Sequence, residues 1–249
     1  MSDFHEQLIN DYGKAIMDPI QQFNPKDYDR FIKRYHRLFA SLLPSDRNSR
    51  VLDVGCGDGY FLKFLQSEGF SKLEGVDASN DRLEICKKYV TPTVYHSEAI
   101  EWLNAHPNEY EFISAHHIIE HFTDDKLIPF VQALARSLKE NGRLILTTPN
   151  ATSPWAGYNH YHDLTHRRLF ATDSLSQLLS QARFKASFYP DGPVAFDFPS
   201  TLRWSVWKWR EAWLKLQFRI DMGGTRGTQK TPLIVSPNLI AVAYKSKSS

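Results

Sequence analysis

The first clear pattern in the sequence is an amphipathic helix near the N-terminus. Between residues 28 and 43, apolar side chains recur at steps of three and four, with Lys33, Arg34 and Arg37 between them. This spacing gathers the apolar side chains on one face of a helix. Pro44 marks its end. We therefore expect residues 1–49 to form a helical cap in front of the first strand.

Beyond Pro44, short apolar runs alternate with segments of helical periodicity. The apolar runs predict strands at residues 50–54, 73–76, 93–96, 111–115 and 143–148. The intervening segments predict helices at residues 60–67, 81–89, 100–105 and 124–139. Strands joined by helices form a parallel sheet, because right-handed crossovers place the helices on both faces.

Three more elements follow: a helix at residues 172–181, a strand at 185–189 and a strand at 239–244. The chain is therefore predicted to be a single α/β domain over residues 1–249, built on a seven-stranded, mostly parallel, doubly wound (Rossmann-like) sheet. Residues 50–190 form its core and 238–245 its final strand. Residues 191–237 are longer than a turn between two strands requires, and we interpret them as an insertion.

The insertion contains a Trp-rich amphipathic helix. Six apolar residues share one stripe along it: Leu202, Val206, Trp209, Trp213, Leu216 and Ile220. A second apolar patch consists of Trp204, Trp207, Leu214 and Phe218, and basic residues are spread around it. The stripe can pack on the domain or on a second subunit of a homodimer. Alternatively, a basic Trp-rich helix can lie at a membrane surface. Protein packing and membrane contact are compatible if the stripe packs inward and the second patch faces lipid.

Composition narrows the class of protein. With 249 residues, 42% of them hydrophobic, the chain is long enough for one full domain, and no apolar run is long enough to span a membrane. No secretory signal precedes the first helix, so we expect a cytoplasmic protein, with peripheral contact at the inner membrane through residues 201–220 left open. The net charge of +2 is too small to indicate nucleic-acid binding. Cys56 and Cys86 have neither metal-type spacing nor the character of a disulfide.

The strongest chemical signal follows the first predicted strand. In the run 51–60, VLDVGCGDGY, a strand leads into three alternating glycines, and a helix begins directly after them. Such a turn lets the backbone approach a nucleotide-like ligand closely. Asp77, at the end of the second strand, can accept hydrogen bonds from two ribose hydroxyls. The dinucleotide fingerprint would require a third glycine at Tyr60, which disfavours an NAD-dependent dehydrogenase.

Over residues 50–184 the sequence resembles class I S-adenosylmethionine-dependent methyltransferases. The resemblance implies that the glycine turn lies beneath the methionyl and ribose portions of S-adenosyl-L-methionine, that Asp77 binds the ribose, and that the segment from Ser97 to Ile100 faces the adenine. The cofactor-binding residues that we predict on this basis are Asp53, Gly55, Cys56, Gly57, Asp77, Ala78, Glu98, Ala99 and His116.

Two groups of histidines are candidates for a general base, which helps an oxygen nucleophile of high pKa. The segment from Ile113 to His121 looks like the family's fourth strand and following loop, and it places His121 toward the acceptor pocket. After the fifth strand, the segment HDLTHRR (162–168) resembles one found in bacterial methyltransferases of ubiquinone and surface-polysaccharide synthesis. It contains His162, Asp163 and His166. We expect the catalytic residues to be His121, His162, Asp163 and His166. We favour His162 or His166 as the base because Asp163 can orient a neighbouring imidazole.

Other roles for this loop remain open. Some of its histidines can serve only to hold the loop through hydrogen bonds. His160, His162 and His166 with Asp163 could also bind a metal, but methyl transfer to oxygen does not require one, so we predict no metal site. Arg167 and Arg168 are either surface charges or contacts for an acidic group on the acceptor.

These signals favour an O-methyltransferase that uses S-adenosyl-L-methionine and acts on a bacterial glycan or a lipid-linked glycan precursor. One alternative is a methyltransferase of small, quinone-type molecules. Another is a regulator that binds S-adenosyl-L-methionine without catalysis, although such a protein has no need of candidate bases near the methyl group.

Overall fold

The computed structural model describes residues 8–9, 12, 14, 16, 23–192, 198–221 and 231–245. Its framework is a seven-stranded sheet with the strand order β3-β2-β1-β4-β5-β7-β6. The strands are β1 (Val51–Val54), β2 (Leu73–Asp77), β3 (Val94–His96), β4 (Tyr110–His116), β5 (Leu138–Pro149), β6 (Phe184–Asp191) and β7 (Asn238–Lys245). β7 runs antiparallel to both β5 and β6, and the other pairings are parallel. The predicted mostly parallel, doubly wound sheet is confirmed.

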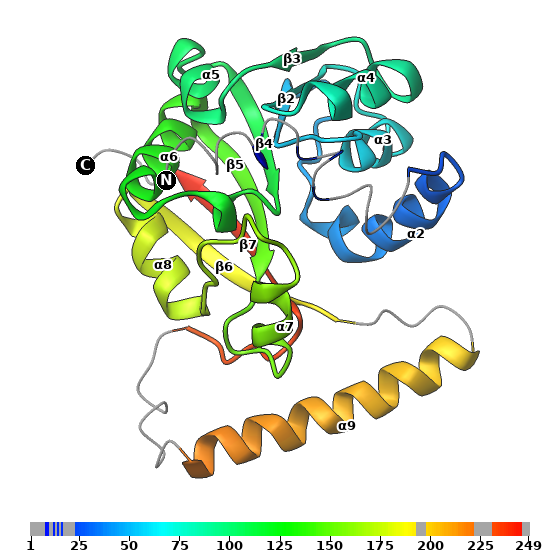
Figure 1. Cartoon of the computed structure of the whole chain (residues 1–249), viewed down its shortest axis with the longest axis vertical. Coiled ribbons are helices and arrows are strands. Elements are labelled where there is room, and N and C mark those ends of the chain that lie inside the picture. Colours follow the sequence, from blue (N-terminus) through cyan, green and yellow to red (C-terminus); the bar gives the residue numbers. More distant parts are fainter. Residues whose placement is uncertain are drawn as a thin grey trace.

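Helices cover both faces of this sheet (Figure 1). One layer contains α2 (Asp27–Phe39), the short 3-10 helix η2 (Ala40–Leu42), α3 (Tyr60–Ser67) and α4 (Asn80–Tyr89). The other contains α5 (Ala99–Ala105), α6 (Asp124–Ser137) and α8 (Thr172–Ser180). Each layer buries its own apolar cluster against the sheet, so the central strands are covered on both sides. β1 illustrates this, because all four of its residues are buried. Burial on both faces explains why apolar and polar side chains do not alternate along this strand.

Several boundaries differ from the sequence prediction. The first helix ends at Phe39 and continues as η2, whereas the periodicity predicted one helix to residue 43. The segment after β5 was predicted as a loop, but it contains the short helix α7 (Ala156–Tyr161). Between β4 and α6 lies the 3-10 helix η3 (Ile119–His121). These short elements carry no hydrophobic periodicity of their own, because fewer than two turns cannot display it.

The Trp-rich segment forms α9 (Phe198–Asp221), which lies apart from the sheet, beyond α7 (Figure 1). The side facing the rest of the protein includes Trp207, which packs next to Gly192, and Glu211, which is 7% exposed. Arg210 lies over the ring of Trp155, 4.9 Å from its centroid. The stripe from Leu202 to Ile220 is on the outside, with its six side chains 49–72% exposed.

Of the alternatives considered from the sequence, packing of this stripe on the domain is therefore wrong, since the opposite side of α9 makes these contacts, while packing on a second subunit stays a prediction. Periodicity identifies which residues share a face of a helix, but both apolar faces of α9 satisfy the rule. Among the described residues, no helix is both long and apolar enough to cross a bilayer.

Candidate active site

A cavity of about 830 Å³ opens at the carboxyl ends of β1, β2 and β4. This is the edge where parallel α/β sheets bind their ligands. The last residues of these strands and the loops that follow them supply much of its lining, including Asp53, Gly55, Asp77 and His121. The volume falls within the range of about 300–1,000 Å³ that is usual for small-molecule sites.

The glycine turn forms the floor of this cavity. Gly55 has a φ of +72°, which L-residues rarely adopt, and a Cβ there would lie 3.0 Å from Cδ1 of Ile118. Gly59 has a φ of +79°, and its Cβ would lie 2.5 Å from Sγ of Cys86. The turn therefore requires glycine for both its backbone conformation and its packing. α3 begins at Tyr60, directly after the turn, so its first amide groups face the same region.

Asp77 ties the end of β2 to this turn. Its Oδ2 accepts a hydrogen bond from the amide of Gly57 at 2.8 Å, and its Oδ1 accepts one from the amide of Ser79 at the same distance. Burial raises the pKa of Asp77, and these two amide bonds oppose the shift. Because each carboxylate oxygen can accept further bonds, Asp77 can still receive two hydroxyls from the cavity.

Asp53 is the second acid of the cavity and is 3% exposed. Ser114 Oγ donates a hydrogen bond to its Oδ1 at 2.7 Å. Burial raises the pKa of Asp53 to about 7, the Ser114 hydrogen bond opposes the shift, and the charge of Asp77 adds to it. A cationic ligand group would relieve this penalty by stabilising the carboxylate.

The other predicted cofactor residues also line the cavity: Cys56, Gly57, Ala78, Glu98, Ala99 and His116. Glu98 is exposed and immediately precedes α5. Cys56 is buried, and its interaction with Cys86 together with burial raises its pKa well above the usual value, so its thiol stays protonated. Burial lowers the pKa of His116 to about 3, which keeps that ring neutral. Its Nδ1 lies 3.0 Å from Oγ1 of Thr147.

The predicted catalytic residues lie near one another, since the rings of His162 and His166 are 5.2 Å apart, centroid to centroid, but only His121 of the four lines the cavity. The His166 ring lies 4.9 Å from that of His121, centroid to centroid. Asp163 is buried but lies within hydrogen-bond distance of neither the His121 ring nor the His166 ring. It accepts a hydrogen bond from Thr165 Oγ1 at 2.6 Å. The same hydroxyl contacts Nδ1 of His121 at 2.8 Å. His162 is exposed, and its Nδ1 lies near backbone carbonyls of its own helical turn.

The structure therefore does not bring His162 to the cavity. α7 explains its position, because His162 immediately follows this helix and its ring stacks on Tyr158 at 5.2 Å, one turn earlier. Of the two arginines after His166, Arg167 lines the cavity, whereas Arg168 forms an exposed ion pair with Asp124 at 2.9 Å.

Sequence reasoning missed several residues of the site. Aromatic side chains from α2 and the start of α3 form one wall, among them Phe31, Tyr35 and Tyr60. Their signal was the apolar stripe at residues 28–43, which indicated a buried face without showing what it covers. Tyr12 also lines the cavity and donates a hydrogen bond to Oδ2 of Asp163 at 2.6 Å. No local pattern marks a contact between residues so distant in sequence.

Comparison with known proteins agrees with this architecture. The family model described as a methyltransferase domain matches residues 23–186. The chain belongs to this family and is a class I S-adenosyl-L-methionine-dependent methyltransferase, so S-adenosyl-L-methionine is its methyl donor. The glycine cradle and the Asp77 carboxylate fit that group, and membership sets aside the dehydrogenase alternative.

Its relatives include two proteins named ubiquinone biosynthesis O-methyltransferase. The one from Sodalis glossinidius is 29% identical over 137 residues, which cover 53% of this chain and 51% of that protein. The one from Bartonella quintana is 28% identical over 147 residues, which cover 56% and 58%. The chain thus spans about half the length of the curated relatives it matches.

Solved structures share the fold at lower identity. A SAM-dependent methyltransferase from Archaeoglobus fulgidus is 21% identical, with a TM-score of 0.61 over 88% of this chain and 94% of that one. Phosphoethanolamine N-methyltransferase 2 from Haemonchus contortus, in complex with S-adenosyl-L-methionine, is 15% identical, with a TM-score of 0.58 over 98% and 60%.

Proposed function

We propose that this protein methylates a hydroxyl oxygen of a small, quinone-type aromatic acceptor. The observation that carries the proposal is the composition of the cavity, which joins the glycine turn to an aromatic wall and to the imidazole of His121. An aromatic acceptor can stack on Phe31, Tyr35 or Tyr60. The relatives named for ubiquinone biosynthesis support the same acceptor class.

The glycan acceptor favoured by the sequence moves to second place. Its basis was the HDLTHRR segment and the basic, aromatic insertion, but neither relative described above is named for a glycan. The insertion itself fits a lipid-soluble acceptor equally well, so it no longer favours a sugar.

In this proposal S-adenosyl-L-methionine supplies a methyl group on a sulfonium, and the residues of the chain bind and align the two reactants. Asp77 holds ribose hydroxyls, and Gly55 and Gly57 leave room for close backbone approach. His121 meets the acceptor hydroxyl. Thr165 fixes the orientation of that ring, because its hydroxyl donates to Asp163 and therefore accepts from Nδ1 of His121. Nε2 then carries the lone pair.

This geometry moves the catalytic proposal from His162 and His166 to His121. The His166 ring packs 4.9 Å from that of His121, its side chain is only 6% exposed, and neither His166 nor His162 lines the cavity. Asp163 keeps the orienting role that we expected, but acts through the hydroxyl of Thr165.

The exposed stripe of α9 supports contact with an anionic membrane surface. Advancing about 100° per residue around the helix places exposed Arg203 on one flank of the stripe and exposed Arg219 on the other. Lys208, Lys215 and Arg210 lie nearer the inner side, where they contact Glu211 and Trp155. Trp209 and Trp213 are 72% and 50% exposed within it. Tryptophan at headgroup depth with cations on both sides is the usual arrangement of an interfacial helix. A quinone precursor with an apolar tail would be met at such a surface.

Transfer of labelled methyl from S-adenosyl-L-methionine tests the acceptor. The assay compares lipid-soluble polyhydroxyphenols with lipid-linked saccharides, each in detergent. We expect label in the phenols, and we expect His121→Ala to lower kcat by roughly 10²–10⁴-fold, while His162→Ala leaves it near normal. Label in the saccharides alone would contradict the proposal. Binding of S-adenosyl-L-methionine with no transfer to either class would favour a non-catalytic protein.

A further inference from the structure

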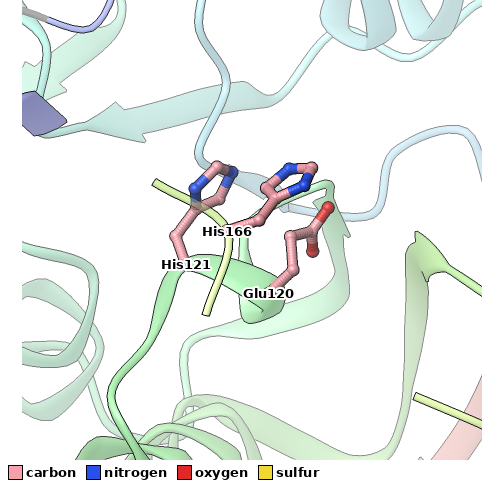
Figure 2. Close-up of side chains that lie close together, drawn as sticks. All are labelled: Glu120, His121 and His166. Atoms are coloured by element: carbon pink, nitrogen blue, oxygen red, sulfur yellow. The ribbon is translucent and has the colours of Figure 1, made fainter. Parts of the chain in front are cut away.

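Three side chains with metal-binding groups converge at the edge of the cavity. Glu120 and His121 are neighbours in η3, and His166 comes from the loop after α7. One ligand atom from each lies within 4.8 Å of the other two. Figure 2 shows the two imidazole rings side by side, with the Glu120 carboxylate on the same side of η3. This set differs from the His160, His162, His166 and Asp163 combination considered from the sequence.

Both imidazoles are held in the tautomer that suits a metal ligand. Nδ1 of His166 lies 2.6 Å from the carbonyl oxygen of Asn159, which can only accept, so this nitrogen is the donor. Nδ1 of His121 donates to Thr165 Oγ1, because that hydroxyl gives its own proton to Asp163. In each ring the lone pair is therefore on Nε2. Metal-bound histidines are held in this way by an acceptor at the other nitrogen.

The carboxylate of Glu120 supplies the negative charge. Glu120 is fully buried, and Oε2 accepts a hydrogen bond from Thr148 Oγ1 at 3.1 Å. Oε1 lies 3.1 Å from Nδ1 of His117. Glu120 forms an ion pair with His117 when that ring is protonated, and a divalent ion on the same carboxylate would add further compensating charge. The hydrogen bonds also fix the orientation of the group, as neighbouring residues do for ligating carboxylates.

We infer that Glu120, His121 and His166 bind a divalent transition-metal ion at the acceptor end of the cavity. Two histidines and one carboxylate leave coordination positions open, which is the donor set of catalytic zinc and of non-haem iron. Zinc–ligand bonds are about 2.0–2.2 Å long, so binding of one ion requires the three ligand atoms, which lie within 4.8 Å of one another, to move closer together.

An ion here would hold the acceptor oxygen, a role that rests on the proposed function. On binding the ion, the hydroxyl loses its proton to water, because the positive charge lowers the pKa of that hydroxyl. A lone pair of the oxygen then forms the new C–O bond, and the electrons of the S–C bond return to sulfur, which changes from sulfonium to thioether. His121 thereby acts as a ligand, and no side chain has to accept the proton.

Metal binding can be measured without activity. The purified full chain is treated with chelator, dialysed, and titrated with Zn²⁺ by calorimetry. We expect binding of one ion per chain, and an affinity at least roughly tenfold lower in His121→Ala, His166→Ala and Glu120→Gln. His36→Ala is the control, since that histidine is exposed on α2 and lies outside the cluster, and this variant should bind Zn²⁺ as the unmodified protein does.

Titration of the same samples with S-adenosyl-L-methionine separates this inference from the proposed function. Retained cofactor affinity shows that each variant is folded and that the cofactor site is intact. Chelation should abolish methyl transfer, and added Zn²⁺ or Mn²⁺ should restore it. Absence of Zn²⁺ binding, or equal affinity in the three cluster variants and the control, would overturn the inference. Methyl transfer that persists after chelation would leave His121 as a base and the proposed function standing.

Discussion

The hydroxyl of Thr165 lies 2.8 Å from Nδ1 of His121, although 44 positions separate the two residues in the chain. This bond joins the segment after β5 to the turn after β4, so the two strand ends act as one site. Because the same hydroxyl donates to Asp163 at 2.6 Å, it determines which nitrogen of His121 carries the proton.

Replacing Thr165 with valine tests this connection. Thr165→Val keeps the shape of the side chain but leaves Asp163 and His121 without their shared partner, so the free energy of unfolding should fall by about 1–3 kcal/mol. Methyl transfer should fall as well, with cofactor affinity unchanged. Urea denaturation measures the first effect. Thr93→Val is the control, because the Thr93 hydroxyl makes only a 3.4 Å contact with Thr91. Equal stability of the two variants would mean that the bridge contributes nothing.

Asp53 gives the cofactor affinity a pH dependence of definite sign. Its pKa is raised to about 7, chiefly by burial, so the carboxyl is largely protonated below that pH. The cofactor carries a sulfonium and an ammonium group, either of which would favour the ionised form. Binding below pH 7 should therefore release a proton, and affinity should weaken by up to roughly tenfold per pH unit as the pH falls. Above pH 7 this contribution is constant.

Calorimetry in two buffers of different ionisation enthalpy detects the released proton. The binding enthalpy of the unmodified protein should depend on the buffer one pH unit below the pKa of Asp53, and should depend on it less one unit above. In Asp53→Asn the dependence at low pH should disappear, because the amide does not titrate. An unchanged dependence in that variant would assign the proton to a different group.

The outer stripe of α9 should bind anionic lipid. Trp209→Ser combined with Trp213→Ser removes two of its exposed rings and should reduce co-sedimentation with phosphatidylglycerol vesicles at low salt. Ile128→Ser, at a 44% exposed position on α6, is the control for loss of an apolar surface residue elsewhere. If the unmodified protein stays in solution with these vesicles, the membrane proposal is wrong.

The part of the cavity lined by the ends of β1 and β2, where we expect the cofactor, could be predicted from sequence because its determinants are local. Gly55 and Asp53 stand in one strand-to-turn unit, and Asp77 ends the next strand, so the parallel sheet brings them together at one edge. The acceptor end could not be predicted in the same way. Glu120, Thr165 and Tyr12 come from three distant segments, and only tertiary packing brings them near His121 and Asp163.

α9 shows a second limit of sequence reasoning. The spacing correctly grouped Trp209 with Trp213, but two apolar faces competed for the interior. Trp207 packs next to Gly192 at the end of β6, and Glu211 is buried while paired with Lys208 and Lys215. The surface of the domain that Trp207 contacts exists only once the domain has folded. No periodicity within the helix encodes it.

The most direct test of the whole account is calorimetric titration of S-adenosyl-L-methionine into the unmodified protein and into Asp77→Ala. We predict measurable binding, weakened in Asp77→Ala by about 1–3 kcal/mol because buried ribose hydroxyls lose a charged acceptor. Glu84→Ala, an exposed position on α4, should bind as the unmodified protein does. Equal affinity in Asp77→Ala and Glu84→Ala would contradict the placement of the cofactor against the end of β2.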